Sequence, residues 1–415
     1  MRKKISLLLL FILNSICLLL WLDILYPPNL NKIQHLSRQV LDHSGELVYL
    51  TLSSDDTWRI STITLPETYK KLLIHIEDKN FFQHHGIDFG AIIRAGYQNL
   101  KARRVISGAS TLTMQTVRLL EPRPRTFKNK IIEVFRAWQL ERRLSKSEIL
   151  QIYSTLAPMG GNIEGINAAA LYYFNKPVTK LSLSEIAWLI TIPQAPNRLK
   201  HPQQSLKARN QLLNKAYQNS VISQTDYHNA SKEMLTLHQY SFPRYAPHYS
   251  QKQLSQHPQE NIILTALDLS LQKKLENRLT KALAQLDNKS NLAAAIIDNN
   301  TAQILAYLGS ADYYSTRRKG QNDLLTAIRS PGSTLKPFIT LYAFEHLRYQ
   351  ANSKIDDTLI TTLSYRPTNY DGYYRGTITL TEALVASRNI PAVRLLAEIG
   401  AETFTQYLKK NQLPL

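Results

Sequence analysis

One short stretch of the chain combines residue types that could transfer a proton. Residues 76–88 place Glu77 and Asp78 side by side and follow them with Phe81, His84 and Gly86. A carboxylate at the end of an apolar helix face is partly shielded from water, which suits it to proton transfer. An isolated Glu-Asp pair is more often a solvated helix end. The spacing of the aromatic, histidine and glycine residues favours a functional site, with Glu77 as the candidate base.

A second stretch, residues 108–115, begins with a glycine and is rich in hydroxyl groups. Ser110, Thr111 and Gln115 are its candidate substrate-binding residues. Hydroxyls and backbone N–H groups at a helix N-terminus can hold a phosphate or a sugar. The alternative is a simple N-cap, with Ser110 or Thr111 capping the following helix. The two interpretations are compatible, and many basic residues lie nearby.

The apolar spacing over residues 127–143 predicts one amphipathic helix. Lys130 and Glu133 stand one turn apart on it, where they could form a surface ion pair or face a substrate. A further helix is predicted over residues 65–76, leading directly into Glu77.

The N-terminus carries a predicted membrane anchor. Arg2, Lys3 and Lys4 precede an almost wholly apolar run over residues 5–22. This run lies at the lower end of the length that spans a bilayer, and its basic flank should stay cytoplasmic. A cleaved signal peptide is the alternative, although no small-residue cleavage site follows. The net charge of +19 predicts an anionic partner, and no nucleic-acid-binding motif is present. Cys17 is the only cysteine, which excludes an intrachain disulfide and a cysteine-rich metal site.

The C-terminal part contains a second set of candidate catalytic residues. Strands are predicted over residues 261–267, 292–298 and 303–309, and Asp268 is expected to cap a helix running to about Leu286. Ser333 and Lys336 form S-x-x-K, where the lysine could take the proton of a serine nucleophile. That spacing is weak evidence by itself, but Ser387 and Asn389 follow as S-x-N.

These motifs together resemble those of a known family. The first two stretches read E-D-x-x-F-x-x-H-x-G and G-x-S-T-x-T-x-Q, and they resemble the first two motifs of the peptidoglycan glycosyltransferases, lysozyme-like enzymes that polymerise lipid II. Residues 129–133 resemble the third motif, R-K-x-x-E, except that Asn129 replaces the arginine. Residues 148–155 resemble the fourth, with Thr155 replacing an asparagine, and residues 165–176 resemble the fifth. S-x-x-K and S-x-N resemble the transpeptidase motifs of class A penicillin-binding proteins, with the type 1C branch closest.

The resemblance implies a multidomain fold. It comprises an N-terminal transmembrane helix (1–26), a mainly α-helical lysozyme-like glycosyltransferase domain (50–205), a helical linker (206–247) and an α/β penicillin-binding transpeptidase domain (248–415). No K-T-G follows Asn389 in this sequence. In the family that motif closes the transpeptidase site, so we expect the last domain to be incomplete and not to form a stable acyl-enzyme with penicillin.

The resemblance also implies an activity. Glu77 would deprotonate the acceptor sugar of lipid II, and Lys130 and Glu133 would position or neutralise the leaving undecaprenyl pyrophosphate. Asp78, Phe81 and His84 would bind substrate. No cofactor is implied as required, and a divalent metal at the pyrophosphate is left open. The partners would be lipid II, the growing glycan strand, the membrane and a cell-wall synthesis complex. The enzyme would lie on the outer side of the bacterial inner membrane. A lytic glycosidase and a non-catalytic relic remain alternatives, the latter because of Asn129 and Thr155.

Overall fold

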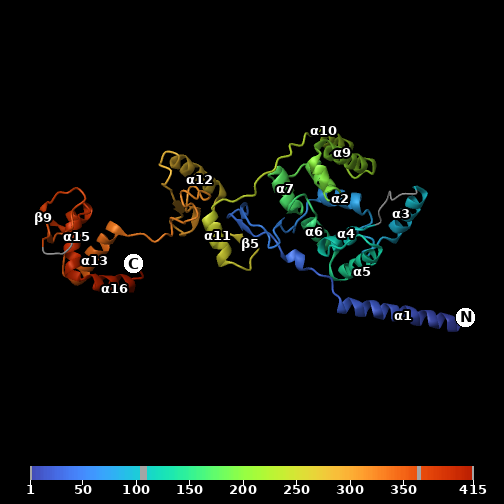
Figure 1. Ribbon diagram of the computed structural model, residues 1–415, viewed down its shortest axis with the longest axis horizontal. Helices are drawn as coiled ribbons and strands as arrows, with labels where there is room; N and C mark the ends of the chain where they lie inside the picture. The colour runs from blue at the N-terminus through green and yellow to red at the C-terminus, as the bar shows by residue number, and fades with distance from the viewer. Residues whose placement is uncertain (1, 103–109, 362–365, 414–415) are drawn as a thin grey trace. The chain divides into compact units, whose positions relative to one another are not determined.

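The computed structural model describes residues 2–102, 110–361 and 366–413 (Figure 1). The chain folds into two compact units, residues 1–326 and residues 327–415. The first unit holds the helical domain that carries Glu77, together with a small α/β region. The second holds Ser333, Lys336 and Ser387.

The predicted anchor is helical. Helix α1 spans Arg2–Leu25. Among the residues that the structure describes, no helix is both long enough and apolar enough to span a bilayer. The end of α1 is attached to helix α5 (Phe127–Arg143), because the Asp23 carboxylate accepts hydrogen bonds from Gln139, Arg142 and Arg143.

A bundle of helices forms most of the first unit. Within the described part of residues 51–245, which contains this bundle, the only strands are β3 (Trp58–Arg59) and β4 (Ile163–Glu164), and they pair in parallel. Arg59 of β3 is fully buried and joins the two strands through an ion pair to Glu164 of β4 at 2.6 Å, and it also pairs with Asp55 at 2.8 Å. The helices are α2 (Glu67–Glu77), α3 (Phe89–Ala102), α4 (Leu112–Leu120), α5, α6 (Lys146–Leu156), α7 (Ile166–Phe174), α8 (Leu183–Thr191), α9 (Pro202–Gln218) and α10 (Gln224–Lys232), with 3₁₀ turns at Asn31–Gln34, Val178–Lys180 and Pro196–Lys200. The predicted helices over residues 65–76 and 127–143 are confirmed.

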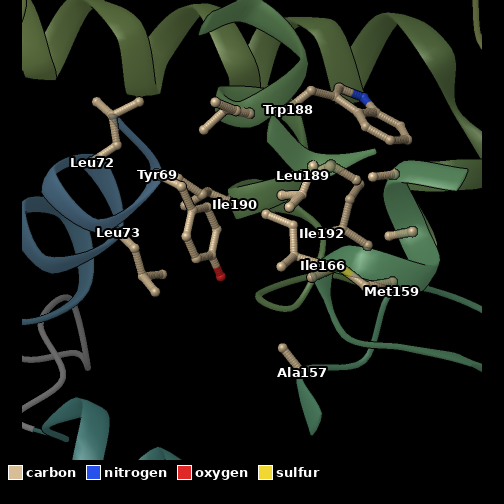
Figure 2. Packing of buried hydrophobic residues seen from close by; sticks show 14 of the residues in the cluster. Tyr69, Leu72, Leu73, Ala157, Met159, Ile166, Trp188, Leu189, Ile190 and Ile192 are labelled. Atoms are coloured by element: carbon tan, nitrogen blue, oxygen red, sulfur yellow. The ribbon is translucent and has the colours of Figure 1, made fainter. Parts of the chain in front are cut away.

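Helix α8 lies at the centre of this bundle. All of its residues from Ser184 to Thr191 are buried, so it has no solvent face. It begins at a capping box in which Ser182 and Glu185 satisfy each other's backbone N–H groups. Figure 2 shows Tyr69 and Leu72 of α2 packed beside the residues that α8 contributes to the core. Helix α2, which ends at Glu77, is therefore held against the most buried element of the domain.

The predicted linker contributes to the same core. Leu212, Leu213 and Ala216 of α9 and Ala230 of α10 are buried in one cluster with the α8 side chains. Helices α9 and α10 therefore pack as part of the bundle, although the domain boundaries themselves stay a prediction.

A small sheet brings together distant parts of the first unit. Its strand order is β2 (Leu47–Leu50), β1 (Gln39–Leu41) and β5 (Ile262–Leu264), with β1 antiparallel to β2 and parallel to β5. Helix α11 (Pro247–Gln256), helix α12 (Leu269–Leu283) and the antiparallel pair β6 (Ala294–Ile297) and β7 (Ile304–Leu308) complete this region. The predicted strands are confirmed, and Asp268 caps α12 as expected.

The second unit is a compact α/β arrangement. A 3₁₀ turn (Gly332–Leu335) runs into α13 (Lys336–His346), and strands β8 (Lys354–Asp357) and β9 (Gly376–Thr379) pair antiparallel. Helices α14 (Leu380–Val385), α15 (Asn389–Ile399) and α16 (Ala401–Lys410) pack around one apolar core. Residue 336 thus begins one helix and residue 389 begins another.

Candidate active site

Glu77 is the last residue of α2, and both of its carboxylate oxygens accept a hydrogen bond from a glutamine amide. Gln115 Nε2 lies 3.0 Å from Oε2, and Gln194 Nε2 lies 2.6 Å from Oε1. Gln115 comes from the second motif, where the sequence indicated it as a substrate-binding residue; that role stays a prediction, and its contact with Glu77 was not predicted. Gln194 follows α8 and was missed, since the only signal was a glutamine between Pro193 and Pro196.

Two buried tyrosines lie close to Glu77 on its protein side. Burial raises the pKa of the Tyr69 phenol. A hydrogen bond with Ser154 lowers this pKa in part, and the negative charge of Glu77 raises it. Burial also raises the pKa of Tyr153 well above its ordinary value, with Glu77 and Tyr69 adding to the effect. Both phenols are therefore neutral.

Asp78 has a different environment from its neighbour. Its side chain is almost fully buried and accepts hydrogen bonds from His84 Nε2 at 3.0 Å and from the backbone N–H of Leu112 at 2.9 Å. Since Leu112 is the first residue of α4, Asp78 attaches the first motif to the second. These contacts lie within the chain, and substrate binding by Asp78 and His84 stays a prediction.

Thr111 and Phe81 also have partners within the fold. Thr111 caps α4 by accepting from the Met114 N–H, and its hydroxyl donates to the Gly86 carbonyl at 2.6 Å. Gly86 has φ +87°, and a Cβ there would lie 2.9 Å from the carbonyl oxygen of Ala137. Phe81 is fully buried in the core. Their substrate-binding roles stay predictions too. Gly108 and Ala109 of the second motif lie outside the described residues.

Glu133 belongs to a charged cluster on the facing helices α4 and α5. Arg118 Nη2 lies 2.9 Å from Glu133 Oε1, and Lys130 Nζ lies 2.8 Å from the same oxygen. Lys130 Nζ also donates to the Ser110 hydroxyl at 2.8 Å. The sequence indicated the pairing of Lys130 with Glu133, whereas Arg118 and the link to Ser110 were not expected.

Two cavities adjoin these residues. A cavity of about 520 Å³ is lined by Glu77, Asp78, Lys79, Arg94, Ser110 and Lys215, among others. A second cavity, also of about 520 Å³, is lined by Ser110, Arg118, Arg123, Arg125, Lys130 and Glu133, among others. Ser110 lines both, so the Glu77 cavity and the basic cavity meet at this residue of the second motif. This arrangement can hold a base beside a site for a large anion.

Three of the four candidate transpeptidase residues, Lys336, Ser387 and Asn389, lie together where α13 and α15 begin. Lys336 is buried, and its ammonium lies 2.7 Å from Asn389 Oδ1 and 3.1 Å from Ser387 Oγ. Ser333 is exposed, and among the described residues the Lys336 ammonium contacts Ser387 and Asn389 rather than Ser333. Burial lowers the pKa of Lys336, and the charge of Arg388 lowers it further. A lowered pKa makes it easier for the Lys336 ammonium to lose a proton.

A buried ion pair supports this second group of residues. Arg388 donates from Nε to Asp357 Oδ2 at 2.8 Å, and Asp357 is fully buried. Asn369 donates to the other Asp357 oxygen at 2.7 Å and accepts the backbone N–H of Asn389 at 2.9 Å. Ser387 itself has a left-handed backbone, with φ +50°. The sequence indicated the motif residues but not this network.

The chain matches two protein families in sequence. The Transglycosylase family model matches residues 46–217, and the model described as Penicillin binding protein transpeptidase domain matches residues 292–413. The first match contains Glu77 and the two cavities that share Ser110, and the second contains Ser333, Lys336, Ser387 and Asn389.

Several penicillin-binding proteins are similar to this chain over most of its length. Penicillin-binding protein 1C of Escherichia coli (strain K12) is 37% identical over 398 residues, which are 95% of this chain and 51% of that protein. Penicillin-binding protein 1F of Bacillus subtilis (strain 168) is 32% identical over 92% of this chain and 56% of that protein. Penicillin-binding protein 1A of Streptococcus oralis is 30% identical over 90% of this chain and 63% of that protein. The chain thus spans about half the length of the first two of these relatives. With a transglycosylase domain followed by transpeptidase-domain sequence, the chain belongs to the class A penicillin-binding proteins.

Proposed function

We propose that the chain is a peptidoglycan glycosyltransferase that polymerises lipid II into β-1,4-linked glycan strands. The observation that carries this proposal is the geometry around Ser110, where the cavity of Glu77 meets the basic cavity of Arg118 and Lys130. A glycosyl transfer from a lipid-linked donor needs a base at one sugar and positive charge at a pyrophosphate. The two cavities supply these two requirements next to each other.

Glu77 acts as the general base in the proposed mechanism. It takes the proton from the 4-hydroxyl of the acceptor sugar, and that oxygen attacks the anomeric carbon of the donor. The new C–O bond forms as the bond between the anomeric carbon and the pyrophosphate oxygen breaks, which inverts the anomeric centre. The electron pair of the broken bond leaves with undecaprenyl pyrophosphate.

Arg118 and Lys130 stabilise the charge that develops on the leaving pyrophosphate. Positively charged donors already in place act more strongly than water, because they need not reorganise during the reaction. Glu133 holds both cations in this position through its carboxylate. Asn129 lines the same cavity where the family has arginine, and Arg123 and Arg125 supply positive charge around it.

A divalent metal does not fit the donor set of this cavity. Its lining carboxylates are Glu121 and Glu133, and each already lies within ion-pair distance of an arginine or a lysine. Magnesium and calcium prefer several free oxygen ligands. We therefore assign no step to a metal and ascribe charge neutralisation to the basic side chains.

The lytic alternative receives less support from the same contacts. A glycosidase uses a second carboxyl group as acid, base or nucleophile beside the first. Glu133 is held between Arg118 and Lys130, and its contacts are those of a carboxylate that orients cations. The non-catalytic alternative gives no reason for the two hydrogen bonds by which Gln115 and Gln194 align the Glu77 carboxylate.

We further propose that α1 anchors the chain in the bacterial inner membrane, with the rest of the chain on its outer side. The basic start of the helix and the substrate, which is a membrane lipid, support this placement. In the transpeptidase half, Ser333 would be the nucleophile and Lys336 its base, with Ser387 and Asn389 binding substrate. A cell-wall synthesis complex is the proposed protein partner.

Incubation of the purified chain with fluorescent lipid II tests the function. Formation of long glycan polymers, lost in the Glu77→Gln variant, would support it. Release of short fragments from preformed glycan strands would favour the lytic alternative, and no reaction with either substrate would favour the relic.

A further inference from the structure

We infer that Gln194 is a positioning residue for the base Glu77, an inference that rests on the proposed glycosyl transfer. Gln194 Nε2 donates to Glu77 Oε1 at 2.6 Å, while Gln115 Nε2 donates to Oε2 at 3.0 Å. The two amides thus hold the two oxygens of one carboxylate from different parts of the chain.

Backbone hydrogen bonds and two prolines hold the loop that carries Gln194. It follows directly after α8, the buried central helix. The N–H of Ala195 donates to the Ile192 carbonyl at 3.0 Å, and the N–H of Arg198 donates to the Ala195 carbonyl at 3.0 Å. Pro193 and Pro196 restrict the backbone on both sides. Gln194 therefore extends from a turn that is attached to the core of the domain.

Two donors align a carboxylate better than one. The last torsion of a glutamate side chain has a broad, roughly two-fold energy profile, so a single hydrogen bond leaves the plane of the carboxylate loosely defined. A second donor on the other oxygen defines that plane. Each oxygen keeps a further lone pair, so Glu77 can still accept the proton of a sugar hydroxyl.

The contact has no evident role in stability. Gln194 is exposed to solvent, and the fold beneath it is held by α8 and the buried cluster of the bundle. Its removal should therefore leave the folded state intact but let the base rotate. Misplacement of a reacting group by about 1 Å can cost on the order of a hundredfold in rate.

Kinetics of the full chain with lipid II give the first test. We expect Gln194→Ala to lower kcat by about 10- to 100-fold, with KM and the melting temperature essentially unchanged. In the Glu77→Gln background the same substitution should have no further effect on the rate, because the base that Gln194 positions is gone. Gln203→Ala is the matched control, since Gln203 is an exposed glutamine near the start of α9.

Nuclear magnetic resonance of the glutamine side-chain amides gives a second test that needs no substrate. The Gln194 amide signal, assigned through the Gln194→Ala variant, should move on Glu77→Gln substitution. An unmoved signal, or a Gln194→Ala variant as fast as the wild type, would overturn the inference. If the wild type polymerises no lipid II, the proposed function fails and this catalytic role fails with it. The amide signals then still decide whether the contact exists.

Discussion

Substitution of Glu77 by glutamine removes the proposed base with almost no change in shape. The two amides that face it both donate hydrogen bonds to the carboxylate. A glutamine at this position would present an N–H₂ group to one of them. That neighbour can turn its own amide over and accept instead of donating. We therefore expect the free energy of unfolding to change by less than about 1 kcal/mol, which is the net value of an ordinary hydrogen bond.

The effect on catalysis should be far larger than the effect on stability. A general base contributes about 10²- to 10⁴-fold to a rate. At 1.36 kcal/mol for each factor of ten, this is about 3 to 5 kcal/mol in the barrier. An amide cannot take the proton of the sugar hydroxyl, and the buried tyrosines on the protein side of Glu77 are neutral phenols that cannot replace it as a base.

The assay is polymerisation of fluorescent lipid II, with thermal unfolding recorded on the same samples. Glu67→Gln is the control, because Glu67 lies at the other end of α2 and pairs with Lys70 on the surface. A Glu77→Gln variant within about threefold of the wild type, or roughly 0.7 kcal/mol in the barrier, would refute the assignment.

Three further outcomes test other parts of the structure. Lys130→Met should lower kcat/KM for lipid II by about 10²-fold or more with an unchanged melting temperature; a normal rate would mean that Lys130 does not face the leaving group. Asp357→Ala should destabilise the second unit by about 1.5–3 kcal/mol because it removes one charged hydrogen bond from buried Arg388, which keeps its ion pair to Asp371; hydrogen exchange should show this loss in the second unit and unchanged protection in the first. Burial alone would raise the pKa of Asp55, but hydrogen bonds from a neighbouring serine and Arg59 lower it to about 2. Since this pKa lies below the ordinary value, Asp55 stabilises the fold above about pH 4, and that contribution is lost as the pH falls toward 2. As the pH falls, the Asp55→Asn variant should therefore lose about 1 kcal/mol less of its free energy of unfolding than the wild type, after allowance for solvent screening.

The elements that local patterns predicted were found in the structure, although they are a minority of its helices and strands. The helix over residues 127–143 has apolar residues at helical spacing along its whole length, and its observed bounds agree with the prediction. Asp268 was expected to cap a helix because its side chain can accept from the first turn, and it does so. The pairing of β1 with β5 was not predicted. It joins Gln39 to Ile262, and no local pattern connects residues so far apart in the chain.

The same limit applies to the candidate sites. Motif spacing indicated Glu77 and Gln115, which meet in the structure. Gln194 could not be found in this way, since it lies 117 residues from Glu77 and belongs to no charged or catalytic pattern. The spacing of Ser333 and Lys336 indicated a shared helix face. Spacing cannot indicate where the flexible lysine side chain points, and here it lies against Ser387 and Asn389.

The adjacent acids Glu77 and Asp78 make different contacts in the structure. Helix α2 ends at residue 77, so the chain turns there and the two side chains point into different surroundings. The Asp78 side chain turns inward and holds the N–H of Leu112, which fixes the start of α4. Gln115 follows one turn later on α4 and therefore reaches the Glu77 carboxylate. Asp78 thus helps to place the Gln115 amide that holds the proposed base Glu77, and this gives a physical reason for the two carboxylates of the first motif to lie beside the second motif.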